Sequence, residues 1–157
     1  MADTYTQLYI RIIFAVKGRE SFIPKQHKEA VHQYITGVIT QKKQTVIQIN
    51  SMPDHLDILV GISPDIAISD LVRDIKAISS KWINKNGWVV GRFEWQPGFG
   101  AFSYAHSQLD MVVDYIKDPE AHHSGRTFQA EYLEFLERVG VRYNPGYVFD
   151  WVDGSEE

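Results

Sequence analysis

A run of alternating residues near the middle of the chain constrains its fold more than any other feature. Between His55 and Ile62, apolar side chains occupy every even position, which is the period of a half-buried β-strand. The odd positions begin with His55 and Asp57. Burial of the even-numbered side chains against a core therefore forces these two polar residues out together on the opposite face.

His55 and Asp57 form the first candidate site. An imidazole and a carboxylate two positions apart on one strand face make a ready pair of ligands for a hard or borderline divalent ion. The same two residues also suit the polar face of an ordinary edge strand. The strand alone leaves both interpretations open.

A second candidate residue, Tyr115, lies at the edge of a predicted helix. Leu109, Val112, Val113 and Ile116 follow the spacing of a helix with one apolar stripe. At roughly 100° per residue, Tyr115 falls about 110° from the centre of that stripe. Its hydroxyl can therefore reach a group outside the helix, although a boundary tyrosine with a solvated tip gives the same pattern.

The composition indicates one globular domain, with a core over residues 5–140 and an aromatic-rich tail over residues 141–157. Of the 157 residues, 44% are hydrophobic and 13% are aromatic, which is ordinary for such a domain. The absence of cysteine excludes disulfides and thiolate metal sites. No apolar run approaches the roughly eighteen residues of a membrane span, and the N-terminus does not read as a signal peptide, so we expect a cytoplasmic protein without a membrane partner.

Charge is unevenly distributed along the chain. The net charge of −4 and the pI near 5.8 speak against an indiscriminate binder of polyanions. Basic residues nevertheless gather in the first half, and acidic residues concentrate in the last third. This distribution fits a DNA-binding protein with a basic front, and it fits plain solubility equally well.

The order of the predicted elements gives the fold class. Strands are expected at residues 5–16, Thr45–Asn50 and Asp54–Ile62, with two short ones near Arg92–Gln96 and Phe99–Tyr104. With helices after the first and third strands, the order is the βαββαβ of ferredoxin-like and RNA-recognition-motif-like α+β domains. In such domains helices cover one face of an antiparallel sheet, which leaves the other face available for nucleic acid or a second subunit.

Helix boundaries follow from capping residues. We expect Pro24 to open the first helix, Ser69 to cap the second and Gly87 to end it, and Thr127 to cap the last helix, which ends at Gly140. The apolar stripe of the second helix is predicted at Leu71, Ile75, Ile78 and Trp82. Aromatic tail residues expected to pack on the domain or on a partner are Tyr143, Tyr147, Phe149 and Trp151.

Together, the strand with His55 and the helix with Tyr115 resemble the single-tyrosine HUH transposases, small enzymes of insertion sequences that move as single-stranded DNA. In that family a strand reading Met-Pro-Asp-His-hydrophobic-His carries two metal-binding histidines. A later helix carries the nucleophilic tyrosine, and a glutamine four residues further on completes the metal site. The resemblance covers residues 5 to about 140, and it includes the opening strand, the Ile68–Trp82 helix, the Trp95–Ser103 segment and the His122-His123 pair.

Two positions depart from the family pattern. Asp57 stands where the family has its second histidine, and Pro119 stands where it has the glutamine. Aspartate binds Mg²⁺ or Mn²⁺ more readily than histidine does. Proline offers no side-chain ligand and should kink or end the helix. The candidates to replace the missing ligand are Asp118, Glu120 and His122.

The resemblance implies a DNA transposase that binds hairpin-bearing single-stranded DNA and cleaves and rejoins it through a 5′-phosphotyrosine on Tyr115. A Mg²⁺ or Mn²⁺ ion on His55 and Asp57 would polarise the scissile phosphate. The resemblance also implies a homodimer, in which the tyrosine helix of one chain faces the metal strand of the other. The basic residues expected to contact DNA are Lys17, Arg19, Arg73, Lys76 and Lys81.

Two alternatives stay open beside this expectation. Asp57 and Pro119 also fit a diverged family member that keeps hairpin binding but has lost cleavage. An unrelated small-molecule enzyme or interaction domain on the same common fold is the third possibility, because a fold alone does not fix a function.

Overall fold

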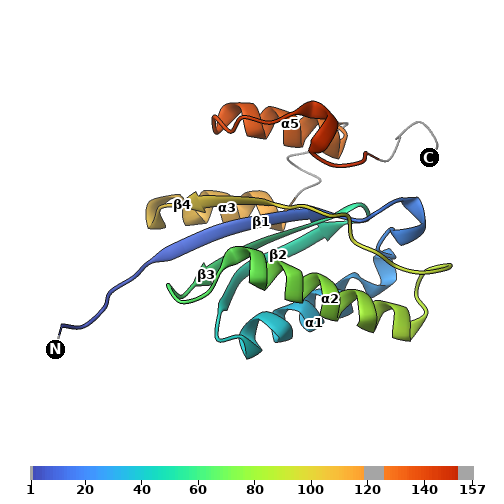
Figure 1. The fold of residues 1–157 in the computed structure, drawn as a ribbon, viewed down its shortest axis with the longest axis horizontal. Coiled ribbons are helices and arrows are strands. Elements are labelled where there is room, and N and C mark those ends of the chain that lie inside the picture. Colours follow the sequence, from blue (N-terminus) through green and yellow to red (C-terminus); the bar gives the residue numbers. More distant parts are fainter. Residues whose placement is uncertain (1, 119–125, 152–157) are drawn as a thin grey trace.

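The computed structural model describes residues 2–118 and 126–151, with the side chain of Arg19 excepted. Its centre is a four-stranded antiparallel sheet in the order β2-β3-β1-β4 (Figure 1). The strands are β1 (Leu8–Ala15), β2 (Thr45–Met52), β3 (His55–Ile62) and β4 (Gly100–Tyr104). This arrangement confirms the predicted α+β class.

The two central strands, β1 and β3, place their side chains as the alternation predicts. Ile12 lies opposite Ile58 and Ile13 lies opposite Asp57 in the antiparallel register. One face of this pair is wholly apolar, and the other carries the polar odd-numbered residues of β3. Both faces are buried, with Ile58 fully inaccessible and Asp57 only 9% exposed.

Helices α1 (Lys28–Gln41) and α2 (Ile68–Asn86) cover the apolar face, which we call the first face of the sheet (Figure 1). Pro24 precedes a short 3-10 turn, Lys25–His27, that leads into α1. Gly87 ends α2 in the left-handed conformation with φ of 64°, as predicted. The capping prediction at Ser69 was wrong, because Ala67 is the residue before α2 and Ser69 lies inside its first turn.

The predicted apolar stripe of α2 was also partly wrong. Ile78 is 39% exposed, whereas Ser79 and Ile83 are buried. The hydroxyl of Ser79 donates to the carbonyl of Ile75 at 2.6 Å and accepts from the indole N–H of Trp95 at 3.0 Å. These two bonds satisfy a buried polar side chain, and they let the helix turn a serine rather than an isoleucine toward the core.

The opposite face of the sheet, which we call the second face, is covered as well, contrary to the expectation of an open surface. Helix α3 (Leu109–Lys117) packs on β2 and β3, and α5 (Phe128–Arg138) forms a separate layer above the sheet (Figure 1). Thr127 caps α5 by accepting a hydrogen bond from the amide of Ala130 at 3.1 Å, as predicted.

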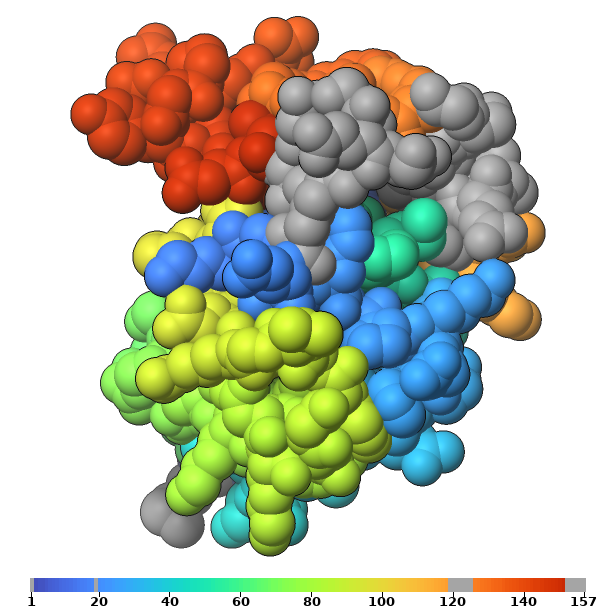
Figure 2. Space-filling view, turned by 90° about the vertical axis from the view of Figure 1, so that its right-hand side faces the viewer, coloured from blue at the N-terminus to red at the C-terminus, as the bar shows by residue number. Residues whose placement is uncertain are grey.

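The aromatic tail packs on α5, as the sequence predicts for most of its residues. Tyr143, Phe149 and Trp151 join Tyr132 and Leu136 in one cluster above β1. This packing removes apolar side chains of α5 and of the tail from water. The tail therefore stabilises the layer that α5 forms. Figure 2 shows this layer on one side of the sheet and α2 on the other.

The structure also bears on the strands expected after α2 and on the possibility of a membrane span. Within the described residues after α2, β4 is the only strand, because the segment near Arg92–Gln96 contributes a single bridge between Trp95 and Val16. Among the described residues, no helix is long and apolar enough to cross a membrane.

Candidate functional site

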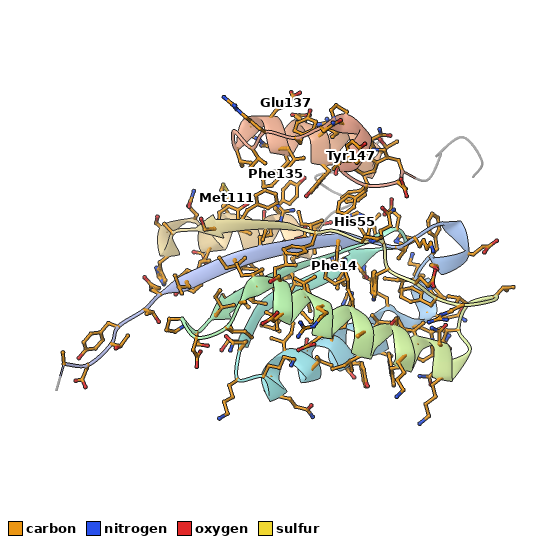
Figure 3. All side chains as sticks on the ribbon, viewed as in Figure 1. Phe14, His55, Met111, Phe135, Glu137 and Tyr147 are labelled. Atoms are coloured by element: carbon orange, nitrogen blue, oxygen red, sulfur yellow. The ribbon has the colours of Figure 1, made fainter. Side chains whose placement is uncertain are left out.

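Side chains from four elements meet in a small cavity on the second face. Its volume is about 20 Å³, close to the space that one water molecule needs. His55 and Asp57 reach it from β3 and Tyr115 reaches it from α3, all within one chain. His55 lies on the α5 side of the sheet in Figure 3, and Phe14 lies on the α2 side. The remaining lining residues are Arg11, Ile13, Phe128, Glu131, Tyr132 and Phe135.

Asp57 is held by Arg11 of the neighbouring strand in a buried, two-pronged ion pair. The guanidinium donates from Nε to Oδ1 at 2.9 Å and from an Nη to Oδ2 at 2.6 Å. The side chains are only 9% and 13% exposed. Burial alone would lower the pKa of Arg11, but Asp57, with a smaller contribution from Tyr104, raises it overall. Arg11 therefore keeps its charge, and both carboxylate oxygens of Asp57 accept hydrogen bonds from it.

His55 is fixed on both sides. Its Nδ1 lies 2.7 Å from the Asp54 carboxylate, and its ring stacks on Phe128 of α5 with centroids 3.8 Å apart and an interplanar angle of 8°. A carboxylate at Nδ1 selects the tautomer that has its lone pair on Nε2, which is the arrangement found in metal-binding and proton-accepting histidines. The ring is 5% exposed, so Nε2 faces protein rather than solvent.

Tyr115 lies next to the ion pair, as its position at the edge of the helix stripe suggests. The Arg11 guanidinium carbon is 5.1 Å from the centroid of the Tyr115 ring. Burial raises the pKa of the phenol above its usual value of 10, Arg11 lowers it, and Asp57 raises it again. The net shift is upward, so the hydroxyl keeps its proton at neutral pH.

As they stand, the described side chains do not fit a divalent ion. Among residues 2–118 and 126–151, no three histidine, aspartate or glutamate side chains lie close enough together to hold one. Asp57 would first have to leave Arg11, and His55 would have only Nε2 left to offer a metal. Of the candidate third ligands, Asp118 follows the last residue of α3, and Glu120 and His122 lie outside the described residues, as does Pro119. The metal site at His55 and Asp57 therefore stays a prediction.

Sequence reasoning missed the residues that surround this group. Arg11 is the principal omission, because a charged residue inside an apolar strand signals a buried partner. Asp54 and Phe128 are two more, since one anchors the His55 ring and the other covers it. Glu131 of α5 also lines the cavity, with its carboxylate buried.

The predicted DNA-contacting residues lie on α2 and in the segment after β1. Lys17 pairs with Glu94 at 2.9 Å, and Arg73 pairs with Asp70 at 3.2 Å on the exposed surface of α2. Lys81 lines an open hollow beside α2. Arg19 lies in the turn after β1, and its side chain is outside the described part of the chain.

Lys76 of α2 binds the backbone of the loop before β4 rather than extending into solvent. Its ammonium donates to the carbonyls of Gln96 at 2.7 Å and Gly98 at 2.6 Å, and it lies 5.3 Å from the centre of the Phe14 ring. Burial lowers its pKa to about 8. The lysine therefore holds the loop before β4 against α2.

Comparisons with known proteins agree with this architecture. A transposase from Deinococcus radiodurans, ISDra2 transposase TnpA, is 23% identical over 118 residues, which cover 71% of this chain and 83% of the relative. A crystal structure of a protein from the same organism, described as a transposase, superposes with a TM-score of 0.59 at 19% identity, over 75% of this chain and 95% of the other.

A second solved structure covers more of the chain. It is a REP-associated tyrosine transposase bound to a REP hairpin, with a TM-score of 0.58 and 18% identity over 99% of this chain and 94% of the other. Its coverage includes the region of α5 and the tail. At these identities, the two structures support the fold alone.

The family follows from the sequence match. The model of the IS200-like transposases matches residues 4–119, a span that includes the sheet, α1, α2 and the helix with Tyr115. This span is well over half of the chain. The protein therefore belongs to the family of IS200-like transposases.

Proposed function

We propose that this protein binds hairpin-bearing single-stranded DNA as a member of the transposase family that has lost metal-assisted cleavage. One observation carries the second half of this proposal. The Arg11 guanidinium occupies both oxygens of Asp57, at the position where the family resemblance implies a metal ligand. A cation is already present there, and a second one would be repelled by it.

The state of Tyr115 supports the same conclusion. A tyrosine attacks phosphorus as the phenolate, so it needs a base or a lowered pKa. Here burial raises the pKa of the phenol. The cavity of about 20 Å³ beside it is also far smaller than a phosphodiester requires.

Strand cleavage by Tyr115 is the second candidate function. It is favoured by the cavity that Tyr115 shares with His55 and Asp57. In this reaction the phenolic oxygen bonds to phosphorus, the bond from phosphorus to the 3′-oxygen breaks, and the released 3′-hydroxyl takes up a proton. The 5′-phosphotyrosine conserves the phosphodiester energy, so the reverse attack rejoins strands. Binding of Mg²⁺ or Mn²⁺ would require Asp57 to separate from Arg11.

A paired binding and cleavage assay decides between the two candidates. The purified protein is mixed with a labelled hairpin oligonucleotide carrying single-stranded flanks, in Mg²⁺, Mn²⁺ or EDTA. We expect a retarded complex in all three conditions and no covalent adduct. An adduct that disappears in Tyr115→Phe, and persists in the matched variant Tyr147→Phe, would establish cleavage. Loss of the complex in every condition would refute DNA binding.

Phosphate contacts are proposed at Lys17, Arg19, Arg73 and Lys81. Lys76 is proposed to act through the loop that it holds, because its donors are engaged by backbone carbonyls. Each phosphate contact steepens the salt dependence of binding by about one power of salt concentration. Replacing the four residues by glutamine should flatten that dependence. An unchanged slope would place the DNA elsewhere.

We also propose a homodimer. The chain before β1 is exposed and extends away from the domain in Figure 1, with Tyr5 88% exposed. Such a segment is available for a second copy. Sedimentation equilibrium at micromolar concentration, with and without hairpin DNA, should give twice the mass of the chain. A monomer in both conditions would refute the dimer.

A further inference from the structure

We propose that a groove between α1, the edge of β2 and the end of α3 holds the unpaired strand that flanks the DNA hairpin. This inference rests on the proposed function, since it specifies where the single-stranded part of the ligand lies. The groove lies on the opposite edge of the sheet from β4, next to the helix with Tyr115.

The groove is of a size that suits nucleotides. Its volume is about 640 Å³, within the roughly 300–1,000 Å³ of sites that bind small organic ligands. It is open to solvent, as a site for a continuous strand must be. Its lining residues are Lys28, Glu29, His32, Gln33, Thr36, Gln48, Ile49, Asn50 and Lys117.

The lining chemistry matches an unpaired nucleic acid. Gln33 and Gln48 each carry a side-chain amide that can both donate and accept, which is what the edges of unstacked bases require. Lys28 and Lys117 supply positive charge for phosphates from α1 and α3. Glu29 is the one carboxylate among the described lining residues; it would disfavour a phosphate beside it and could accept a hydrogen bond from a base amino group.

The walls of the groove are fixed by hydrogen bonds. The side-chain amide of Asn50 donates to the backbone carbonyls of Ile116 at 2.8 Å and Lys117 at 3.3 Å, which joins β2 to the end of α3. The Nε2 atom of His32 lies 2.8 Å from the hydroxyl of Ser51, which joins α1 to β2. Pre-formed walls lower the cost of ordering the site when a ligand binds.

The groove leads toward Tyr115. Asn50 lines it and also lines a second small cavity, together with His55, Asp57 and Tyr115. A strand lying along α1 would therefore pass the end of α3 close to the tyrosine. This juxtaposition distinguishes the groove from the hollow beside α2 at Lys81, whose lining includes none of these residues.

The test compares hairpin oligonucleotides that differ only in their flanks. Affinities are measured by fluorescence anisotropy for a hairpin with no flank, a 5′ flank or a 3′ flank. We expect one flank to strengthen binding by about tenfold, equivalent to a single stacked or hydrogen-bonded nucleotide. The double variant Lys28→Gln/Lys117→Gln and the groove-filling variant Gln33→Trp should remove most of this advantage and leave binding of the blunt hairpin unchanged.

A charge-matched control shows whether the flank advantage depends on lysines in the groove or only on the net charge of the protein. Lys25→Gln/Lys85→Gln removes two positive charges outside the groove and should keep the tenfold flank advantage. In the wild-type protein, a photoreactive thymidine in the flank should cross-link to peptides containing residues 28–36 or 48–50. This second measurement does not depend on whether the variants fold.

The outcomes separate the two proposals. Binding of the blunt hairpin with no flank advantage, or cross-links that map only to α2, would overturn the groove assignment and leave hairpin binding intact. Failure to bind any oligonucleotide would overturn both proposals. A flank advantage that survives both groove variants would also overturn the assignment, and a change of mass in Gln33→Trp would point to a second copy of the chain on β2 instead.

Discussion

The two faces of the sheet carry different kinds of core. The first face, under α1 and α2, is built from isoleucine, valine, leucine and aromatic side chains, and its buried histidine, His32, is bonded to Ser51. The second face, under α3 and α5, surrounds the charged Arg11–Asp57 pair with the rings of Tyr115, Phe128 and Phe135.

The difference suggests that the first face mainly stabilises the fold, whereas the second face carries the groups suited to chemistry. The first face is an ordinary hydrophobic core, in which exact partners matter less than volume and burial. A buried ion pair contributes little net stability and becomes costly when one partner is lost. The buried Arg11–Asp57 pair lies on the second face, and that is also where the family resemblance places catalysis. The following predictions test the comparison.

The largest effect should come from removing one member of the ion pair. Asp57→Leu leaves an unpaired buried guanidinium, and Arg11→Met leaves an unpaired buried carboxylate, so each should lower the free energy of unfolding by about 3–5 kcal/mol. The double variant Arg11→Met/Asp57→Leu should recover most of that loss. Urea denaturation measures all three.

The control for this prediction is Asp74→Asn. Asp74 pairs with Lys42 at 2.6 Å on the surface, where ion pairs contribute about 0–1 kcal/mol. If the double variant lost as much free energy of unfolding as the two single variants lose together, the two residues would not be energetically coupled.

On the first face, His32 should make stability depend on pH. Burial lowers the pKa of His32 to about 4, while nearby Glu29 raises it and Lys28 lowers it further. The unfolded chain, with a pKa near 6.5, binds the proton more readily than the folded one, so stability is complete above about pH 6.5 and is lost as the pH falls toward 4. The loss is at most about 3 kcal/mol for this shift.

The variant His32→Gln should flatten this part of the stability profile, measured as the free energy of unfolding at pH 7 and at pH 4.5. His27, which stacks on Trp88 at 4.0 Å, offers the matched control, and His27→Gln should keep the wild-type slope. An unchanged slope in His32→Gln would assign the pH dependence to other groups.

A smaller effect is expected at the start of α5. Thr127→Ala removes the side-chain cap and should cost about 1 kcal/mol, which would loosen the cover of the second face. Ser69→Ala should change stability by less than about 0.5 kcal/mol, because Ser69 does not cap α2. Thermal denaturation of the two variants, compared directly, measures the difference. Equal effects would contradict the cap assignment.

The smallest effect is predicted for Tyr115→Phe. The half-buried Tyr115 side chain keeps the contact of its ring with Arg11 and loses only its hydroxyl, so the free energy of unfolding should change by less than about 1 kcal/mol. Differential scanning calorimetry gives this value. A loss as large as that of Arg11→Met would make Tyr115 part of the structural core of the second face rather than a side chain available for function.

The sequence predicted much of the fold because the relevant signals are local. Alternation between His55 and Ile62 identified which side chains of β3 share a face, and Thr127 and Gly87 marked helix ends through backbone geometry that their residue types favour. The family resemblance implied that Tyr115 of one chain faces His55 and Asp57 of another, whereas in the structure all three residues of one chain line a single cavity.

Other features depended on contacts between distant segments. The choice of Ser79 over Ile78 in the core of α2 followed from the position of the Trp95 indole. The cover of the second face followed from the packing of α5 and the tail, which no periodicity within β1 or β3 reveals.

The partner of Asp57 shows the limit most clearly. The sequence determined that Asp57 lies on the same strand face as His55, because the period of a strand is two residues. Only the tertiary structure decided that its carboxylate binds Arg11, 46 residues earlier in the chain. That pairing depends on the antiparallel register of β1 against β3, which places the two side chains diagonally across neighbouring strands, and on the burial that makes an unpaired charge costly there.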